Sequence, residues 1–245
     1  MQEIIIFTVG LIAGFLGATV GGGGIVSVPA LLLLGFTPQS AVAINQVGDI
    51  GAFTSAVGEY WRSKKIDWAV AVPLIVITII CSVLGSEIMV RLQTGFLQTF
   101  IGITILMFLP FFFFSKNIGL KQRHTSKTRK TIGFALYALV AIQGAIVGAG
   151  GATVILMIMM YLFGYEIIRG YATNTPAEVF SALIPAIIYA LYGFIKLWPA
   201  VAIFLGMLIG GYIGANTALK KGSKWVKGLF TMVVLVSVIK ILFFR

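Results

Sequence analysis

Residues 17–24 read Gly-Ala-Thr-Val-Gly-Gly-Gly-Gly, and residues 144–151 read Gly-Ala-Ile-Val-Gly-Ala-Gly-Gly. The two stretches lie 127 residues apart and differ at only two of their eight positions. At a spacing of 129 the similarity continues, because Asn45 then aligns with Asn174. One structural unit has therefore been used twice, and glycines interrupt each copy.

The chain around these glycines is strongly apolar. Of its 245 residues, 59% are hydrophobic and 10% are charged, and the mean hydropathy is +1.05. Soluble domains average about half apolar and about a quarter charged residues, so this class is excluded. The long apolar runs predict an all-α, polytopic helical membrane protein. We expect helices over residues 4–20, 25–35, 40–60, 68–90, 96–115, 132–147, 152–163, 171–193, 198–219 and 228–244.

The longest polar stretch divides the chain into a first transmembrane repeat (1–115), a basic linker (116–130) and a second repeat (131–245). If each glycine-broken segment enters the membrane and returns, 14 basic residues lie on the linker side and 4 on the other. If each crosses once, the division is 12 and 6. Basic residues gather in cytoplasmic loops, so the stronger asymmetry favours two inverted repeats. This arrangement predicts a multi-pass protein of the cell membrane. Its linker lies in the cytoplasm, and both of its termini lie outside the cell. Whether the short arms span or are re-entrant stays open.

Two glycine-rich turns are the first candidate site. They consist of Gly21, Gly22, Gly23 and Gly24 and of Gly148, Ala149, Gly150 and Gly151. A helix that begins after such a turn directs its positive end and its unpaired N–H groups into the turn, which then binds an anion without a buried arginine. We expect the two turns to face each other across a substrate site. The alternative is that the glycines serve only close helix packing.

An amide followed four residues later by a carboxylate occurs in both halves, as Asn45 with Asp49 and Asn174 with Glu178. This spacing puts both groups on one helix face. Carboxylates inside a membrane are costly and usually face a cavity, so we expect Asp49 and Glu178 to bind a proton or sodium ion. The alternative is that an amide or a hydroxyl caps each carboxyl, which then only fixes helix packing. The polar residues expected to help bind the substrate are Asn45, Gln46, Asn174 and Thr175.

Aromatic residues beside the basic loops indicate contact with the lipid bilayer. These residues, which we expect to be interfacial anchors, are Tyr60, Trp61, Trp68, Trp198 and Trp225. The partners expected are therefore the bilayer and a small anionic substrate, and the oligomeric state stays open. The positive charge is explained by cytoplasmic loops, so no nucleic acid is expected.

Cofactors and catalysis are not expected. Cys81 is the one cysteine and His124 the one histidine, which leaves too few ligands for a zinc, haem or iron–sulfur site. The motifs H-E-x-x-H, G-x-S-x-G and G-x-x-x-x-G-K-[ST] are absent from the sequence. The sequence therefore predicts a protein that is not an enzyme.

The stretch from Gly14 to Pro29, with the following 31–35 and 38–43, resembles the sulfite exporter TauE/SafE family. The repeated core 144–151 also fits the two-unit plan of that family. The resemblance covers nearly the whole chain. It implies a multi-pass carrier for sulfite, thiosulfate or an organosulfonate, coupled to the proton gradient, with both glycine turns at the transport path.

The leading hypothesis is a proton-coupled secondary transporter that exports a small sulfur-containing anion. Two alternatives stay open. The buried carboxylates of Asp49 and Glu178 are also typical of a cation carrier or channel. A membrane subunit without transport of its own is the other alternative, with the basic linker 116–130 as its contact.

Overall fold

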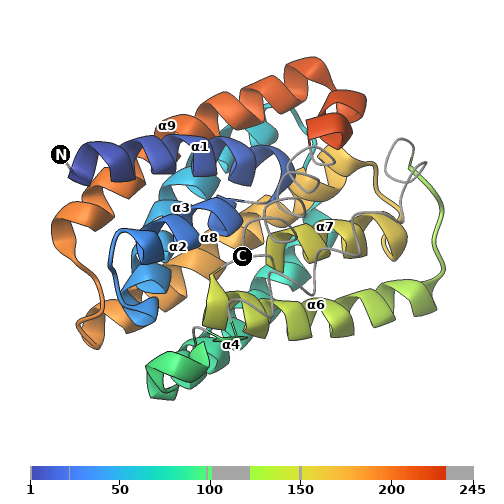
Figure 1. Ribbon diagram of the computed structural model, residues 1–245. Helices are drawn as coiled ribbons and strands as arrows, with labels where there is room; N and C mark the ends of the chain where they lie inside the picture. The colour runs from blue at the N-terminus through green and yellow to red at the C-terminus, as the bar shows by residue number, and fades with distance from the viewer. Residues whose placement is uncertain (1, 22, 98, 101–121, 149–150, 230–245) are drawn as a thin grey trace, which may run out of the picture.

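The computed structural model of the protein describes residues 2–21, 23–97, 99–100, 122–148 and 151–229 (Figure 1). The regular structure in these ranges is helical and contains no strand, which confirms the all-α prediction. The principal helices are α1 (Gln2–Val20), α2 (Gly23–Leu33), α3 (Pro38–Arg62), α4 (Trp68–Arg91), α6 (Lys127–Val147), α7 (Gly151–Tyr161), α8 (Ile167–Leu191) and α9 (Leu197–Lys221). The expected helices 96–115 and 228–244 lie largely outside the described residues.

Helix α6 begins at Lys127, inside the stretch 116–130 that the sequence assigns to the linker. The reason is local, because the side chain of Ser126 accepts a hydrogen bond from the backbone N–H of Arg129 at 3.3 Å. Such an N-cap satisfies one of the unpaired donors of the first turn. The described part of the linker is therefore extended only over residues 122–126.

Five of the described helices, α1, α4, α6, α8 and α9, are long and apolar enough to cross a membrane. This confirms the prediction of a polytopic membrane protein. Helix α3 has the same length as α8, 25 residues, but carries more polar side chains. Helices α2 and α7 have 11 residues each and so measure about 16 Å, roughly half of the bilayer core.

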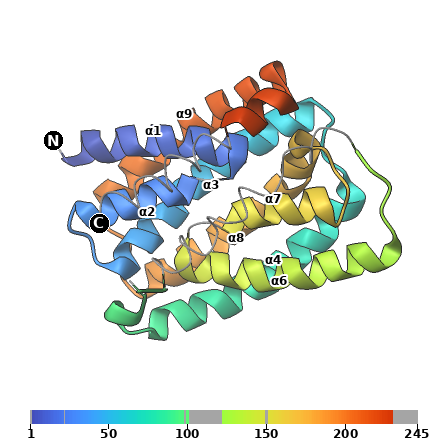
Figure 2. The ribbon, with the colours of Figure 1, turned by 45° about the vertical axis from the view of Figure 1, so that its right-hand side comes forward.

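The two halves pack in matching ways. Helix α4 packs against α6 and α8 of the second half, and α9 packs against α1 and α3 of the first half (Figures 1 and 2). The central pair is α3 with α8. In both views α1 runs from left to right and α6 from right to left. The inverted orientation of the two repeats stays a prediction. It requires α1 and α6 to run in opposite directions, as they do in both views.

The described loops divide between two ends of the molecule. We call one the basic end, formed by loops 63–67, 122–126 and 162–166, where the N–H of Arg123 donates to the carbonyl of Gly164 at 2.7 Å. The opposite end holds loops 34–37, 92–94 and 192–196 (Figure 1). At the opposite end, the basic residues in the described part are Arg91 and Lys196. The other described lysines and arginines belong to the basic end.

Glycines allow α1 and α9 to pack with their backbones in contact. A Cβ at Gly210 would collide with the carbonyl oxygen of Leu11 and lie 2.9 Å from the backbone nitrogen of Phe15. A Cβ at Gly58 of α3 would meet nothing within 4 Å. The stripe of small residues therefore sets the distance between these helices.

This difference gives a stability prediction. We expect Gly210→Ala to destabilise the protein by about 1–3 kcal/mol, because the added methyl group forces the helices apart. The matched control Gly58→Ala should stabilise the protein by up to about 1 kcal/mol, since alanine favours the helix and meets no neighbour. Thermal unfolding in detergent measures both. Equal melting temperatures for the two variants would contradict the packing argument.

Candidate functional site

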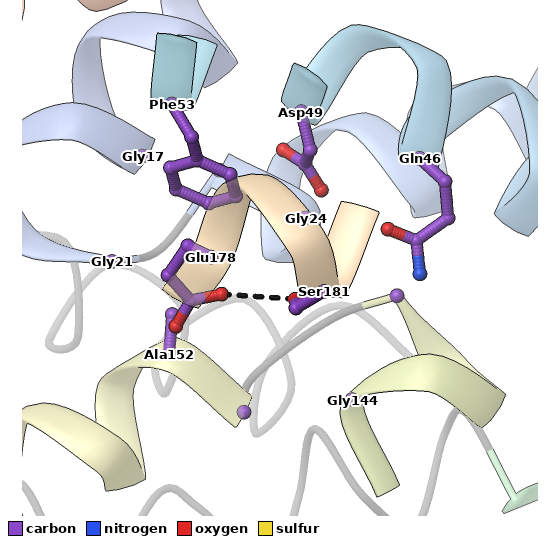
Figure 3. A pocket seen from close by; sticks show the side chains of 13 residues that line it. Gly17, Gly21, Gly24, Gln46, Asp49, Phe53, Gly144, Ala152, Glu178 and Ser181 are labelled. Carbon is purple, nitrogen blue, oxygen red and sulfur yellow. Dashed lines mark hydrogen bonds between the residues drawn. The ribbon is translucent and has the colours of Figure 1, made fainter. Parts of the chain in front are cut away.

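A cavity of about 40 Å³ lies where the two halves meet. It has room for about three water-sized groups. Helices α1, α2, α3, α6, α7 and α8 all contribute to its wall (Figure 3). The lining residues are Gly17, Gly21, Gly23, Gly24, Gln46, Asp49, Phe53, Gly144, Gly148, Gly151, Ala152, Glu178 and Ser181.

The two glycine turns adopt the same conformation. Gly21 has φ of 75° and Gly148 has φ of 66°, a left-handed region that glycine enters without steric cost. The N–H of Gly21 donates to the carbonyl of Gly17 at 3.1 Å, and the N–H of Gly148 donates to that of Gly144 at 2.8 Å. Each pair ends the helix before the turn in the manner of an αL cap.

The turns also face each other, as the repeat predicts. A Cβ at Gly21 would lie 3.0 Å from the carbonyl carbon of Ala152, at the start of α7. The first residues of α2 and of α7 both line the cavity. The first N–H groups of a helix have no intrahelical acceptor, so two positive helix ends open on one space. This arrangement can bind an anion through the backbone alone.

Two buried carboxyl groups lie in the wall of the same cavity, Asp49 from α3 and Glu178 from α8 (Figure 3). The amide nitrogen of Asn45 donates to Oδ2 of Asp49 at 2.7 Å, and that of Asn174 donates to Oε1 of Glu178 at 2.6 Å. Each amide therefore lies on the helix face of its carboxyl, as the spacing predicts, and caps that carboxyl, as the packing alternative also expects. The hydroxyl of Ser181 also donates to Oε2 of Glu178, at 3.1 Å.

The two carboxyl groups differ in the use of their second oxygen. Both oxygens of Glu178 accept a hydrogen bond, whereas Oδ1 of Asp49 accepts none from any residue that the structure describes. A proton bound at Oδ1 of Asp49 would break no existing hydrogen bond. Asp49 therefore has one carboxyl oxygen without a hydrogen-bond partner among the described residues, and Glu178 has none.

Asn45 connects three parts of the site. Its Oδ1 accepts a hydrogen bond from Ser27 of α2, and its Nδ2 donates to the carbonyl of Gly148 at 2.9 Å as well as to Asp49. The side chain is fully buried and lies behind the cavity wall. Asn45 thus ties the broken helix of the first half to the glycine turn of the second.

The structure places the expected substrate ligands in two groups. Gly21, Gly23, Gly24, Gln46, Gly148 and Gly151 line the cavity, and Gly22, Ala149 and Gly150 lie outside the described residues. The other three, Asn45, Asn174 and Thr175, are buried and do not line it. Thr175 donates to the carbonyl of Tyr171 at 2.7 Å, as helical threonines in membranes commonly do.

Some lining residues were missed, although the sequence carried a signal for two of them. Phe53 follows Asp49 by four residues and Ser181 follows Glu178 by three, so each lies on the same helix face as its carboxylate. Gly17 and Gly144 open the repeated stretch but precede the glycine clusters themselves. No signal in the sequence singles out Ala152.

The prediction that Tyr60 is an interfacial anchor is wrong. Its side chain is fully buried and donates to the carbonyl of Ala18 at 2.8 Å. Tyr189, its counterpart at a spacing of 129, donates to the carbonyl of Ala145 in the second half. Each tyrosine therefore holds the end of the helix that leads into a glycine turn. Trp61 and Trp198 are 64% and 71% exposed, as anchors require.

Matched broken helices around one cavity define a polytopic membrane protein of the transporter type. The chain belongs to the sulfite exporter TauE/SafE family, whose model matches residues 6–241. This is a family of membrane transporters, not of enzymes.

Three relatives support this assignment. A "Probable membrane transporter protein ORF9" from Sinorhizobium sp is 22% identical over 97% of this chain and 91% of its own length. A "Probable membrane transporter protein" from Haemophilus influenzae is 23% identical, with 95% and 90% covered. The "Probable membrane transporter protein YfcA" of Escherichia coli is 24% identical, with 98% and 89% covered. No solved structure matches the chain.

Proposed function

We propose that the protein is a secondary transporter that exports a small sulfur-containing anion, such as sulfite, thiosulfate or an organosulfonate, coupled to protons. One observation carries the proposal: two broken-helix N-termini and two buried carboxyl groups line a single cavity. The family name supports a sulfur oxyanion as the substrate class.

The anion is held by the N–H groups at the starts of α2 and α7. Gln46 of α3 presents its amide to the same cavity (Figure 3) and makes no hydrogen bond within the described residues, so its Nε2 is available as a donor. No lysine or arginine lines the cavity in the described part of the chain. Backbone and amide donors therefore supply the attraction for the anion.

The carboxyl groups supply the coupling. With Asp49 and Glu178 ionised, two negative charges in the wall repel an anion from the cavity. With protons bound, the repulsion disappears and the helix ends attract the anion. Anion and proton therefore occupy the cavity together and leave it together.

The distribution of basic residues supports the orientation. The N-terminal end of α1 lies at the end of the molecule opposite to residues 122–126 (Figure 1). Because basic residues mark the cytoplasmic side, the proposal places the basic end in the cytoplasm and the N-terminus outside the cell membrane.

Sulfite flux into liposomes that contain the purified protein tests the proposal. We expect flux that requires the protein and that increases when an imposed pH gradient drives protons in the same direction. Thiosulfate and a small organosulfonate are measured in parallel. Flux of none of the three above that of empty liposomes would contradict the substrate class.

A cation carrier is the second candidate, because the cavity wall holds two carboxyl groups and, among the lining residues, no basic side chain. Flux of sodium that is indifferent to sulfite would favour this candidate. Stoichiometric co-purification with a partner and no flux of either ion would instead favour the membrane subunit without transport.

A further inference from the structure

A second cavity lies at the basic end of the molecule, apart from the glycine turns. Its volume is about 410 Å³, about ten times that of the central cavity. It lies between the α3–α4 loop of the first half and the α7–α8 loop of the second. The residues that line it are Ser63, Lys64, Lys65, Gln122, Glu166 and Arg169. None of them lines the central cavity.

The charge of this cavity is positive. Three basic side chains line it, against the single carboxylate of Glu166. Lys65 lies 3.7 Å from Glu166, and Arg169 lies 3.6 Å from Asp67, a carboxylate outside the lining set. Both ion pairs are long, and the Lys65 and Arg169 side chains are 44% and 38% exposed. Exposed pairs of this length contribute little to stability, so both cations stay available to a ligand.

Arg169 is held in a fixed position. Its Nη1 donates to Oε1 of Gln122 at 2.8 Å, and its guanidinium lies over the ring of Tyr165, 5.6 Å from the ring centre. Tyr165 in turn donates from its hydroxyl to Oδ2 of Asp67 at 2.8 Å. Burial and the neighbouring Asp67 carboxylate raise the pKa of Tyr165, so its hydroxyl keeps its proton and this contact persists at neutral and alkaline pH.

Lys64 occupies a backbone conformation that normally requires glycine. It has φ of 55°, and it is the one residue other than glycine with a positive φ in the described part of the chain. Its N–H donates to the carbonyl of Trp61 at 2.9 Å, and that of Lys65 donates to Tyr60 at 3.3 Å. This is the Schellman pattern that ends a helix, in which glycine is preferred at the position of Lys64.

The second half contains the same turn with glycine in place of lysine. Gly193, at a spacing of 129 from Lys64, has φ of 74° and donates to the carbonyl of Ala190 at 3.0 Å. The following Phe194 donates to Tyr189 at 3.0 Å. The fold therefore accepts glycine here, and the left-handed conformation is unfavourable for lysine. The Lys64 side chain forms no ion pair within the described residues, so its charge is open to a ligand.

We propose that Lys64, Lys65 and Arg169 form a second anion site, at the basic end, for a small doubly charged oxyanion of the sulfate or phosphate type. The cavity is large enough for a hydrated oxyanion, and the guanidinium of Arg169, which donates to Gln122 through Nη1, adds a fixed positive charge to its wall. The binding itself does not depend on transport. The role of the site in collecting anions for the central cavity rests on the proposed function.

Lys64→Gly tests the site, since it installs the residue that the other half uses. The probe is inorganic sulfate, titrated by calorimetry into the protein in phosphatidylcholine nanodiscs. We expect the affinity to fall at least tenfold while the melting temperature rises, because glycine adopts the turn without steric cost. Lys196→Gln, at the opposite end, is the matched control and should bind sulfate like the original protein. Unchanged sulfate affinity in Lys64→Gly would overturn the proposal.

Two further measurements distinguish sulfate binding at this site from binding in the central cavity and from competition by a lipid phosphate. Gly144→Leu, which fills the central cavity, should leave sulfate binding intact; loss of binding there would mean that sulfate occupies the central cavity and would overturn the proposal. In nanodiscs with phosphatidylglycerol, a weaker apparent affinity for sulfate in the original protein would show that a lipid phosphate competes for the same site. Sulfate binding without flux of sulfite, thiosulfate or the organosulfonate would keep this site and reject the proposed transport function.

Discussion

Proton-driven accumulation of the anion is expected to be lost when Asp49→Asn and Glu178→Gln are combined. Both amides are neutral and have nearly the shape of the protonated acids, so the cavity wall no longer changes charge. The helix ends of α2 and α7 still attract the anion. We therefore expect exchange of labelled sulfite across the membrane to continue, while an imposed pH gradient drives no net accumulation.

The single variants should differ in this assay. Oδ1 of Asp49 accepts no hydrogen bond from a described residue, whereas both oxygens of Glu178 are occupied by Asn174 and Ser181. Asp49→Asn should therefore reduce gradient-driven accumulation at least tenfold, and Glu178→Gln should reduce it less. Accumulation that still follows the pH gradient in the double variant would remove both carboxyl groups from the coupling model.

Glu87 provides a control for the loss of a carboxylate as such. It lies on α4, forms an exposed ion pair with Arg91 at 3.2 Å and does not line the cavity. An exposed pair of this kind contributes about 0–1 kcal/mol. Glu87→Gln should therefore leave both the exchange and the pH-driven accumulation of sulfite unchanged.

The sequence predicted the site where its chemistry is local. The repeated glycines predicted two turns that face each other, because the same glycine-rich stretch occurs once in each half. The i, i+4 spacing predicted that Asn45 shares a helix face with Asp49 and Asn174 with Glu178, because helix geometry alone determines that placement.

Contacts between elements distant in the sequence could not be predicted in this way. Nothing in the residue type of Tyr60 distinguishes an interfacial anchor from a buried donor, because the difference depends on the carbonyl of Ala18 on another helix. The role of Asn45 is similar, since its bonds to Ser27 and to Gly148 depend on how the two halves assemble. The sequence does align Tyr60 with Tyr189 at a spacing of 129, and this alignment indicates that the two tyrosines share a role in the repeat.

The fold makes these long-range contacts mutually dependent. Because α4 packs on the second half and α9 on the first, neither half encloses the cavity by itself. Each glycine turn has a neighbour from the other half: Ala152 lies beside Gly21, and Asn45 holds the carbonyl of Gly148. The wall of the cavity therefore depends on contacts between the two halves at both turns.

Filling the cavity from Gly144 is the second change for which we expect a large effect. Gly144 lies in the wall of the cavity on α6, and a Cβ there would meet nothing within 4 Å. Gly144 is also helical, so a side chain does not strain the backbone, and leucine favours a helix more than glycine does. The Cβ of Gly144→Leu is therefore accommodated, and thermal unfolding in detergent measures whether the rest of the side chain is accommodated as well.

We expect the Gly144→Leu protein to lose transport of the anion. A leucine side chain adds four carbon atoms beside a cavity of about 40 Å³, which leaves no room for an anion between the two glycine turns. We expect sulfite exchange and pH-driven flux to fall together by more than tenfold, in contrast to the carboxyl double variant, in which exchange persists. Gly58→Leu, on α3 and outside the cavity wall, is the matched control and should transport normally. Normal flux in a well-folded Gly144→Leu protein would mean that the anion does not pass between the turns, and the transport path would then have to lie elsewhere in the molecule.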